Sequence, residues 1–219
     1  DGGGGEGGEG GGGPSGAQQE AIGCLRRAVS LLGSLHGPAS PPVADAHSQL
    51  SQLYQQAGMA PQAEAEARLA LAAYASCYGD EHEYTATCLA NLGHLLHAQG
   101  EGFKAEGVLR RALAIYGRLH GCGLREGYAR VAGEDYVAAL AALVDVLWEL
   151  QRVDEAAAAY EQQLSLQAAL DHPSAAELGA GHAALANLLW ERREADRALA
   201  HFEAASGHLH AATAEAEAE

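Results

Sequence analysis

The chain has 219 residues, of which 48% are hydrophobic but only 5% aromatic, so alanine and leucine supply most of its apolar surface. This composition is typical of close-packed helices and disfavours a β-sheet fold. The formal net charge of −16 repels phosphate groups, so we expect neither nucleic acid nor an anionic membrane as a partner. No apolar run approaches the roughly 20 residues that a membrane span needs, and no signal peptide is visible.

The N-terminal segment 1–16 is almost entirely glycine and is expected to be a disordered tail, because it has no apolar side chains to bury. Residues 17–36 follow as one amphipathic helix without a helical partner before it. The helix acts either as a cap or as the remainder of a cut repeat. Asp1 in place of methionine suggests a fragment or a processed chain.

The rest of the chain repeats itself. Alanines at equivalent positions recur at spacings of 42, 42, 51 and 42 residues: Ala21, Ala63, Ala105, Ala156 and Ala198. Each of the last four units reads as two amphipathic helices joined by a tight turn, because apolar residues recur three and four apart. The predicted units are the half repeat 17–36 and the repeats 43–79, 83–120, 134–170 and 174–210.

Small residues in the second full unit predict close helix packing. Gly93, Ala105 and Ala112 allow helix backbones to approach where leucine would separate them, and Gly100 suits a left-handed helix C-cap. The next two units replace that turn glycine by Gln151 and Arg193.

One insertion and one tail interrupt this order. Residues 120–136 contain four glycines and predict a loop, with a short helical turn around 124–131. The insertion is either a tolerated surface excursion or a binding loop. Residues 211–219 alternate alanine with acidic residues and are expected to fray from the last helix.

The second full unit carries a family resemblance. It reads NLGHLLHAQGEGFKAEGVLRRALAIY and resembles a tetratricopeptide repeat, while the preceding YGDEHEYTATCLANLG resembles the longer variant of kinesin light chains. The resemblance implies an all-α, right-handed α–α superhelix of about four and a half helix-pair repeats. It also implies a protein-interaction scaffold without catalytic activity.

The sequence contains no residue pattern that predicts a metal-binding or catalytic site. His94 and His97 share a helix face, but no third ligand follows at a confirming spacing. The four cysteines form no C-x-x-C pair, and no nucleophile elbow, phosphate loop or H-E-x-x-H motif occurs. We therefore expect no metal, no cofactor and no enzyme, and a reducing, cytoplasmic location as the default.

The resemblance places a partner-binding groove on the first helix of each unit. Its expected residues are Ser48, Gln52, Gln55, His94, His97, Asp145, Trp148, Glu149, Asn187, Trp190 and Glu191. Trp148 and Trp190 occupy one repeat position and are either binding anchors or core residues packed on the next unit. The set contains acids but no lysine or arginine, so the expected partner segment is neutral or basic.

Two functions are compatible with this pattern. The chain is expected to be a scaffold that holds a protein or peptide in the groove. The alternative is a non-catalytic sensor or targeting segment of a larger enzyme or signalling protein.

Overall fold

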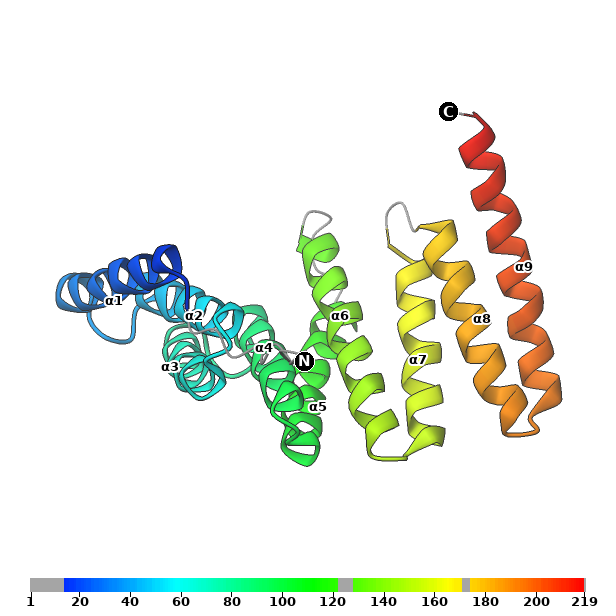
Figure 1. Ribbon diagram of the computed structural model, residues 1–219, viewed down its shortest axis with the longest axis horizontal. Coiled ribbons are helices and arrows are strands. Elements are labelled where there is room, and N and C mark those ends of the chain that lie inside the picture. Colours follow the sequence, from blue (N-terminus) through cyan, green and yellow to red (C-terminus); the bar gives the residue numbers. More distant parts are fainter. Residues whose placement is uncertain (1–13, 122–127, 171–173, 219) are drawn as a thin grey trace, which may run out of the picture. The chain divides into compact units, whose positions relative to one another are not determined.

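The computed structural model describes residues 14–121, 128–170 and 174–218. Across these ranges the backbone forms nine α-helices and no strand, and the helices joined by a tight turn run antiparallel (Figure 1). The predicted all-α architecture of helix pairs is confirmed. The chain divides into two compact units, Asp1–Cys77 and Tyr78–Glu219, and each is described by itself.

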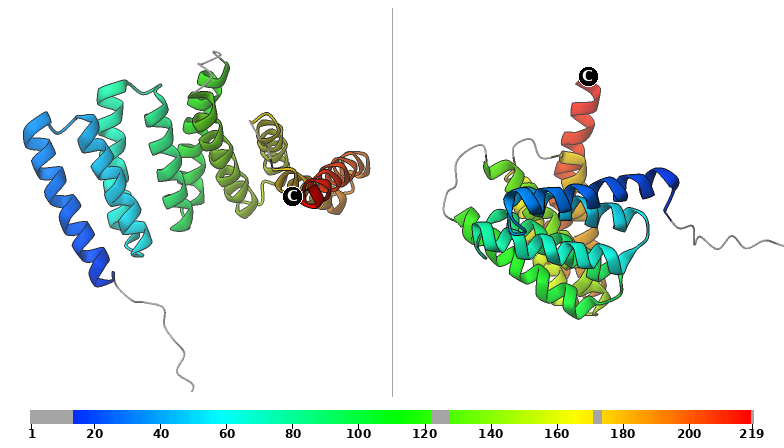
Figure 2. Two further views of the ribbon diagram at one scale, coloured as in Figure 1. Left: turned by 90° about the horizontal axis from the view of Figure 1, so that it is seen from above. Right: turned by 90° about the vertical axis from the view of Figure 1, so that its left-hand side faces the viewer.

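The first unit contains α1 (Gly16–His36), α2 (Pro41–Gln56) and nearly all of α3 (Ala60–Tyr78), which follow one another in Figure 2. Ser15 begins α1 with a capping box, because its hydroxyl accepts from the Gln18 amide and its own amide donates to the Gln18 side chain. The Ser51 hydroxyl donates to the Ala63 carbonyl at 2.8 Å and so joins α2 to α3.

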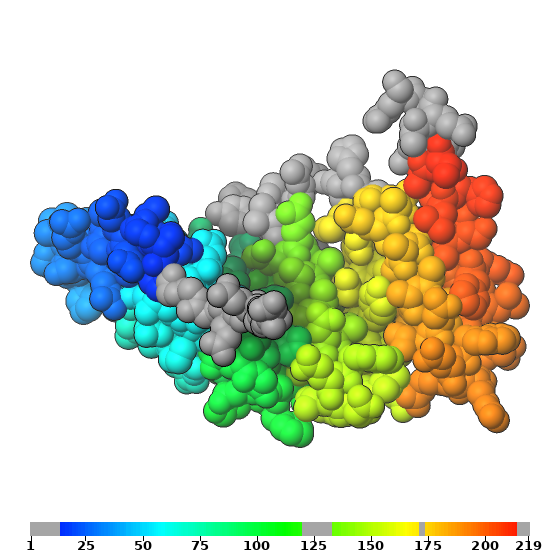
Figure 3. Space-filling model, viewed as in Figure 1, coloured from blue at the N-terminus to red at the C-terminus, as the bar shows by residue number. Residues whose placement is uncertain are grey.

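The second unit consists of further helix pairs. It contains α4 (Glu83–Ala98), α5 (Gly102–Gly121), α6 (Tyr128–Glu149), α7 (Val153–Ala168), α8 (Ala175–Glu191) and α9 (Ala195–Ala218). Helices α6 to α9 lie side by side in chain order, and their side chains form one packed body (Figures 1 and 3). The most completely buried large side chains of the second unit include Leu89, Leu109, Leu147, Leu185 and Leu189.

Small residues bring α4 and α5 together as predicted. A Cβ atom added at Gly93 would lie 2.6 Å from Cγ of Leu109, well inside contact distance. Ala105 and Ala112 on α5 are fully buried. The alanine and glycine positions of the repeat therefore set how closely the two helices pack.

The four turns between paired helices share one backbone conformation. Gly58 and Gly100 have φ of 71° and 79°, and Gln151 and Arg193 adopt the same left-handed region at 59° and 64°. In each turn the amide of this residue donates to the carbonyl three residues earlier, for example Gly100 to His97 at 2.8 Å. The turn is thus kept even where the sequence no longer supplies glycine.

Two boundaries differ from the sequence prediction. Helix α6 begins at Tyr128, so 128–136 is helical where the insertion 120–136 predicted mainly a loop; residues 122–127 lie outside the described ranges. Gly133 is buried inside α6, where packing offsets the weak helix propensity of glycine. Helix α9 reaches Ala218, although fraying was expected from Ala211, because alternating alanine and glutamate are strong helix formers. Of the predicted glycine tail, 1–13 also lies outside the description.

Candidate functional site

The predicted groove positions of the second unit lie on α4, α6 and α8, and their exposed side chains are called the first-helix face below. The exposed members are His94, Asp145, Trp148, Glu149, Asn187, Trp190 and Glu191, and His97 is partly buried. The neighbouring position Ala90 is buried, so it contributes no accessible side chain. Within the first unit, α2 carries Gln52 and Gln55 exposed and Ser48 partly buried.

The two tryptophans are solvent-accessible and have the same local setting. Trp148 is 43% exposed and Trp190 is 63% exposed. The carbonyl of each accepts a 3.0 Å hydrogen bond from the left-handed residue three positions later, Gln151 or Arg193. Both indoles therefore stand one residue before the C-terminal end of a first helix, and neither is a core residue.

Histidines of α4 approach acids of α6. His97 Nε2 lies 3.1 Å from Glu149 Oε1, which brings together two of the predicted groove residues. Partial desolvation of the ring lowers the pKa of His94, and nearby His97 lowers it further, while Asp145 acts in the opposite direction. His94 is thus favoured in its neutral form, and the acids determine the charge of this part of the face.

A second polar cluster, which the sequence reasoning missed, joins α4, α5 and α6. The Thr87 hydroxyl donates to Asp135 at 2.9 Å and lies 3.0 Å from the Tyr116 hydroxyl. Burial raises the pKa of Tyr116 and also that of Glu83, whose pKa Asp135 raises further. Tyr74 makes the equivalent bond to Asp45 in the first unit, which shows that this contact recurs 42 residues apart and could have been sought from the repeat alignment.

Arginines of the second unit lie mainly on the second helices and the turns, where acids hold them. Arg152 binds Glu106 at 2.6 Å and Glu155 at 2.5 Å, and Arg110 contacts the same two carboxylates. Burial would raise the pKa of Glu106, but its hydrogen bonds from Arg110 and Arg152 outweigh that effect and lower it. Arg197 similarly joins Glu161 on α7 to Glu194 at 2.5 Å each. These cations are therefore not available to neutralise the first-helix face.

Comparisons with known protein families and solved structures agree with the helix-pair fold. Residues 43–118 match the tetratricopeptide repeat family. Residues 43–118 are therefore a tetratricopeptide-repeat segment. Three proteins of known structure are similar to it in fold, although a comparison with curated proteins gives no match by sequence.

The first of these structures is BtubC (BKLC) from P. vanneervenii, with a TM-score of 0.72, 22% identity, and coverage of 90% of this chain and 74% of that one. The second is a putative kinesin light chain of Podosopora anserina with nearly identical TPR-like repeats. It has a TM-score of 0.67 and 20% identity, and the match covers 89% of this chain and 88% of that one. The third is MamA, with a TM-score of 0.60, 17% identity, and coverage of 89% of this chain and 90% of that one. The resemblance to tetratricopeptide repeats of the kinesin-light-chain type is confirmed at the level of fold.

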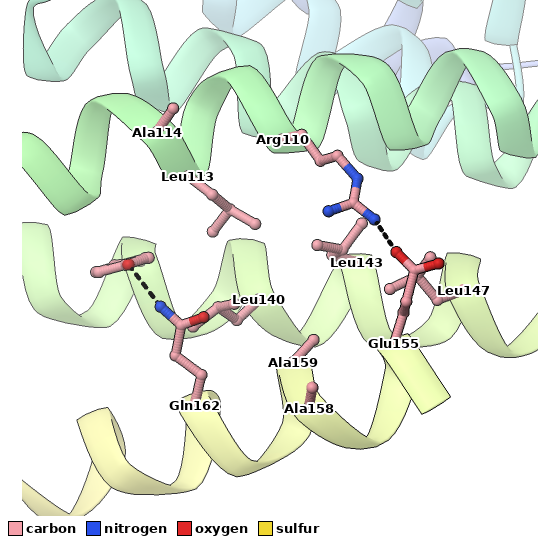
Figure 4. A pocket seen from close by; sticks show the side chains of 11 residues that line it. Arg110, Leu113, Ala114, Leu140, Leu143, Leu147, Glu155, Ala158, Ala159 and Gln162 are labelled. Atoms are coloured by element: carbon pink, nitrogen blue, oxygen red, sulfur yellow. Dashed lines mark hydrogen bonds and ion pairs between the residues drawn. The ribbon is translucent and has the colours of Figure 1, made fainter. Parts of the chain in front are cut away.

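The second unit also has a pocket of about 440 Å³, lined by residues of α5, α6 and α7 (Figure 4). Leucines of α6 and Leu113 form its apolar wall. The Arg110–Glu155 ion pair, at 2.7 Å, closes one end, and Gln162 donates to the Tyr136 hydroxyl at the other, at 2.9 Å. Because its polar groups are already paired, the pocket presents no directing charge to a ligand.

In the described part of the chain, no group of three or more His, Cys, Asp or Glu residues could hold a metal ion. Within the same ranges, none of the helices is both long and apolar enough to cross a membrane. Cys24 is exposed, Cys77 is partly buried and Cys88 is buried, while Cys122 lies outside the described ranges.

Proposed function

We propose that the protein is a non-catalytic scaffold whose first-helix face holds a neutral or basic segment of another protein. Tetratricopeptide repeats generally mediate protein–protein interactions. The observation that carries the proposal is the pair of exposed tryptophans, Trp148 and Trp190, at equivalent positions of consecutive repeats. Exposed indoles bury a large area at little entropic cost, which is the usual property of binding anchors.

The charge of the face supports a neutral or basic partner. Asp145, Glu149 and Glu191 are exposed there, whereas the arginines described above pair with acids of the second helices and turns. A strongly acidic segment would meet repulsion on this face, because like charges at close range raise the free energy of the complex.

Peptide selection tests the proposal. A displayed library of random peptides is selected on the purified chain, and the selected peptides are measured on the double variant Trp148→Ala/Trp190→Ala. Helicity of the variant is checked by circular dichroism. We expect neutral or basic peptides whose affinity falls at least about tenfold in the variant, since two anchors are removed.

A matched control removes two exposed apolar side chains elsewhere. Leu31 and Leu35 on α1 are 70% and 75% exposed, and Leu31→Ala/Leu35→Ala is expected to leave affinity unchanged. Peptides that bind both variants as tightly as the parent chain would exclude the first-helix face as the working surface.

A further inference from the structure

The C-terminal ends of α6 and α8 are built alike on the first-helix face. Each helix ends on a Trp–Glu pair, Trp148–Glu149 and Trp190–Glu191, and all four side chains are exposed. One turn earlier stand Asp145 on α6 and Asn187 on α8, also exposed. The molecule therefore presents the same arrangement of indole, carboxylate and polar side chain twice.

This arrangement is suited to a cation for three independent reasons. An indole face attracts guanidinium and ammonium groups through its quadrupole. The adjacent carboxylate supplies a negative charge, and at the first position Glu149 Oε1 already lies 3.1 Å from the ring nitrogen Nε2 of His97. Finally, each pair stands at a helix C-terminus, where the helix dipole favours positive charge.

Two arginines that follow these pairs in the sequence are held by other acids. Arg192 follows Glu191 directly, yet its guanidinium lies 2.7 Å from Asp154 on α7. Arg152 follows the α6 turn and binds Glu106 and Glu155. Among the described residues no ion pair involves Asp145 or Glu191.

We propose that the two Trp–Glu pairs receive two arginine or lysine side chains of one partner segment, each cation over an indole and beside the following carboxylate. This rests on the proposed function, because it names the chemistry that the same face recognises. In the unbound protein the His97 ring lies beside Glu149, and it is displaced when the partner side chain binds.

Binding of defined peptides tests the inference. The probes are three labelled 12-residue peptides in which serine alternates with arginine, glutamine or glutamate. Indole fluorescence and titration calorimetry are measured at low salt on the full chain. The arginine peptide is expected to bind and to change the fluorescence of the tryptophans, while the glutamate peptide does neither.

Matched variants separate a specific site from the general attraction of a chain with net charge −16. Glu149→Gln/Glu191→Gln removes two charges at the proposed positions. Asp80→Asn/Glu203→Gln removes two charges from exposed acids elsewhere in the same unit. We expect the first pair to weaken arginine-peptide binding about tenfold and the control pair by less than about twofold.

The outcomes distinguish this inference from the proposed function. Equal weakening by both charge pairs means a diffuse attraction and overturns the inference. Selected peptides that depend on Trp148 and Trp190 but not on Glu149 and Glu191 also overturn it, and leave the scaffold function standing. Loss of all dependence on the tryptophans overturns both.

Discussion

At the scale of single residues, the left-handed turn positions carry strain that the sequence does not relieve. Arg193 adopts φ of 64°, where a side chain costs free energy that glycine does not. Gly100 occupies the equivalent turn at φ of 79°. The same backbone position is thus relaxed in one repeat and strained in another.

Replacing Arg193 by glycine is therefore expected to stabilise the protein by about 1 kcal/mol, and Gly100→Ala to destabilise it by a similar amount. Urea unfolding followed by circular dichroism measures both. No ion pair of Arg193 is lost among the described residues. A less stable Arg193→Gly protein would show that the side chain contributes more than the backbone strain costs.

Gly93 gives a second prediction at this scale. A methyl group there would lie 2.6 Å from Cγ of Leu109, so Gly93→Ala must displace that leucine and is expected to cost about 1–3 kcal/mol. Gly107 on α5 offers a matched control, because a Cβ atom there meets nothing within 4 Å. Gly107→Ala is expected to be neutral or to stabilise by up to about 1 kcal/mol. Equal effects in thermal or urea unfolding would refute close packing at Gly93.

At the scale of helices, three histidines join the last pair. His182 Nδ1 on α8 lies 3.0 Å from His201 Nδ1 on α9, and its ring stacks on those of His201 and His208. One of the two nitrogens must donate a hydrogen bond and the other must accept it, so the contact cannot persist with both rings charged. Around the cluster, the α7 carboxylate Glu161 lies 3.6 Å from His201 and is held by Arg197 at 2.5 Å.

Burial lowers the pKa of His182 below its ordinary value of 6.5, and the two neighbouring histidines lower it further. The unfolded chain therefore binds a proton at a higher pH than the folded one. The free energy of unfolding is therefore highest above about pH 6.5. It decreases as the pH falls from there through the pKa that His182 has in the folded protein.

The measurement is urea unfolding at pH 7.5 and pH 5.5, followed by tryptophan fluorescence. The parent chain is expected to lose more stability on acidification than His182→Gln. The control His36→Gln, at an exposed residue of α1, is expected to keep the parent's pH dependence. The same acid sensitivity in His182→Gln would exclude His182 as its source.

At the scale of the whole molecule, the sequence predicted the features that recur in every repeat, but not the contacts between side chains that are distant in the chain. The 42-residue period and the helical spacing of apolar residues were sufficient for the helix pairs, because each unit packs by the same local rules. The shared repeat position of Trp148 and Trp190 followed from the same alignment, whereas their exposure was left open between the groove and the core and is known only from the structure. Their partner-binding role stays a prediction.

Contacts between distant residues could not be read from that alignment. His97 and Glu149 are far apart in the chain, and their 3.1 Å contact depends on how α4 and α6 pack. The left-handed conformation of Gln151 and Arg193 was equally hidden, since neither residue type favours it. The start of α6 at Tyr128 was missed because its glycines signalled a loop.

The division into two compact units yields the last prediction. The chain has only two tryptophans, Trp148 and Trp190, and both belong to the second unit, so indole fluorescence reports that unit while circular dichroism reports all helices. Leu50 on α2 and Leu147 on α6 are each 1% exposed, and truncation to alanine costs about 2–5 kcal/mol at such sites.

Because repeat stability is a sum of local terms, Leu50→Ala is expected to lower the urea midpoint seen by circular dichroism more than the midpoint seen by fluorescence. Leu147→Ala is expected to lower the fluorescence midpoint directly. If Leu50→Ala instead shifts both curves by the same amount, the two units unfold as one cooperative body. The fluorescence signal would then report the stability of the entire array, and the two compact units would not be separate folding units.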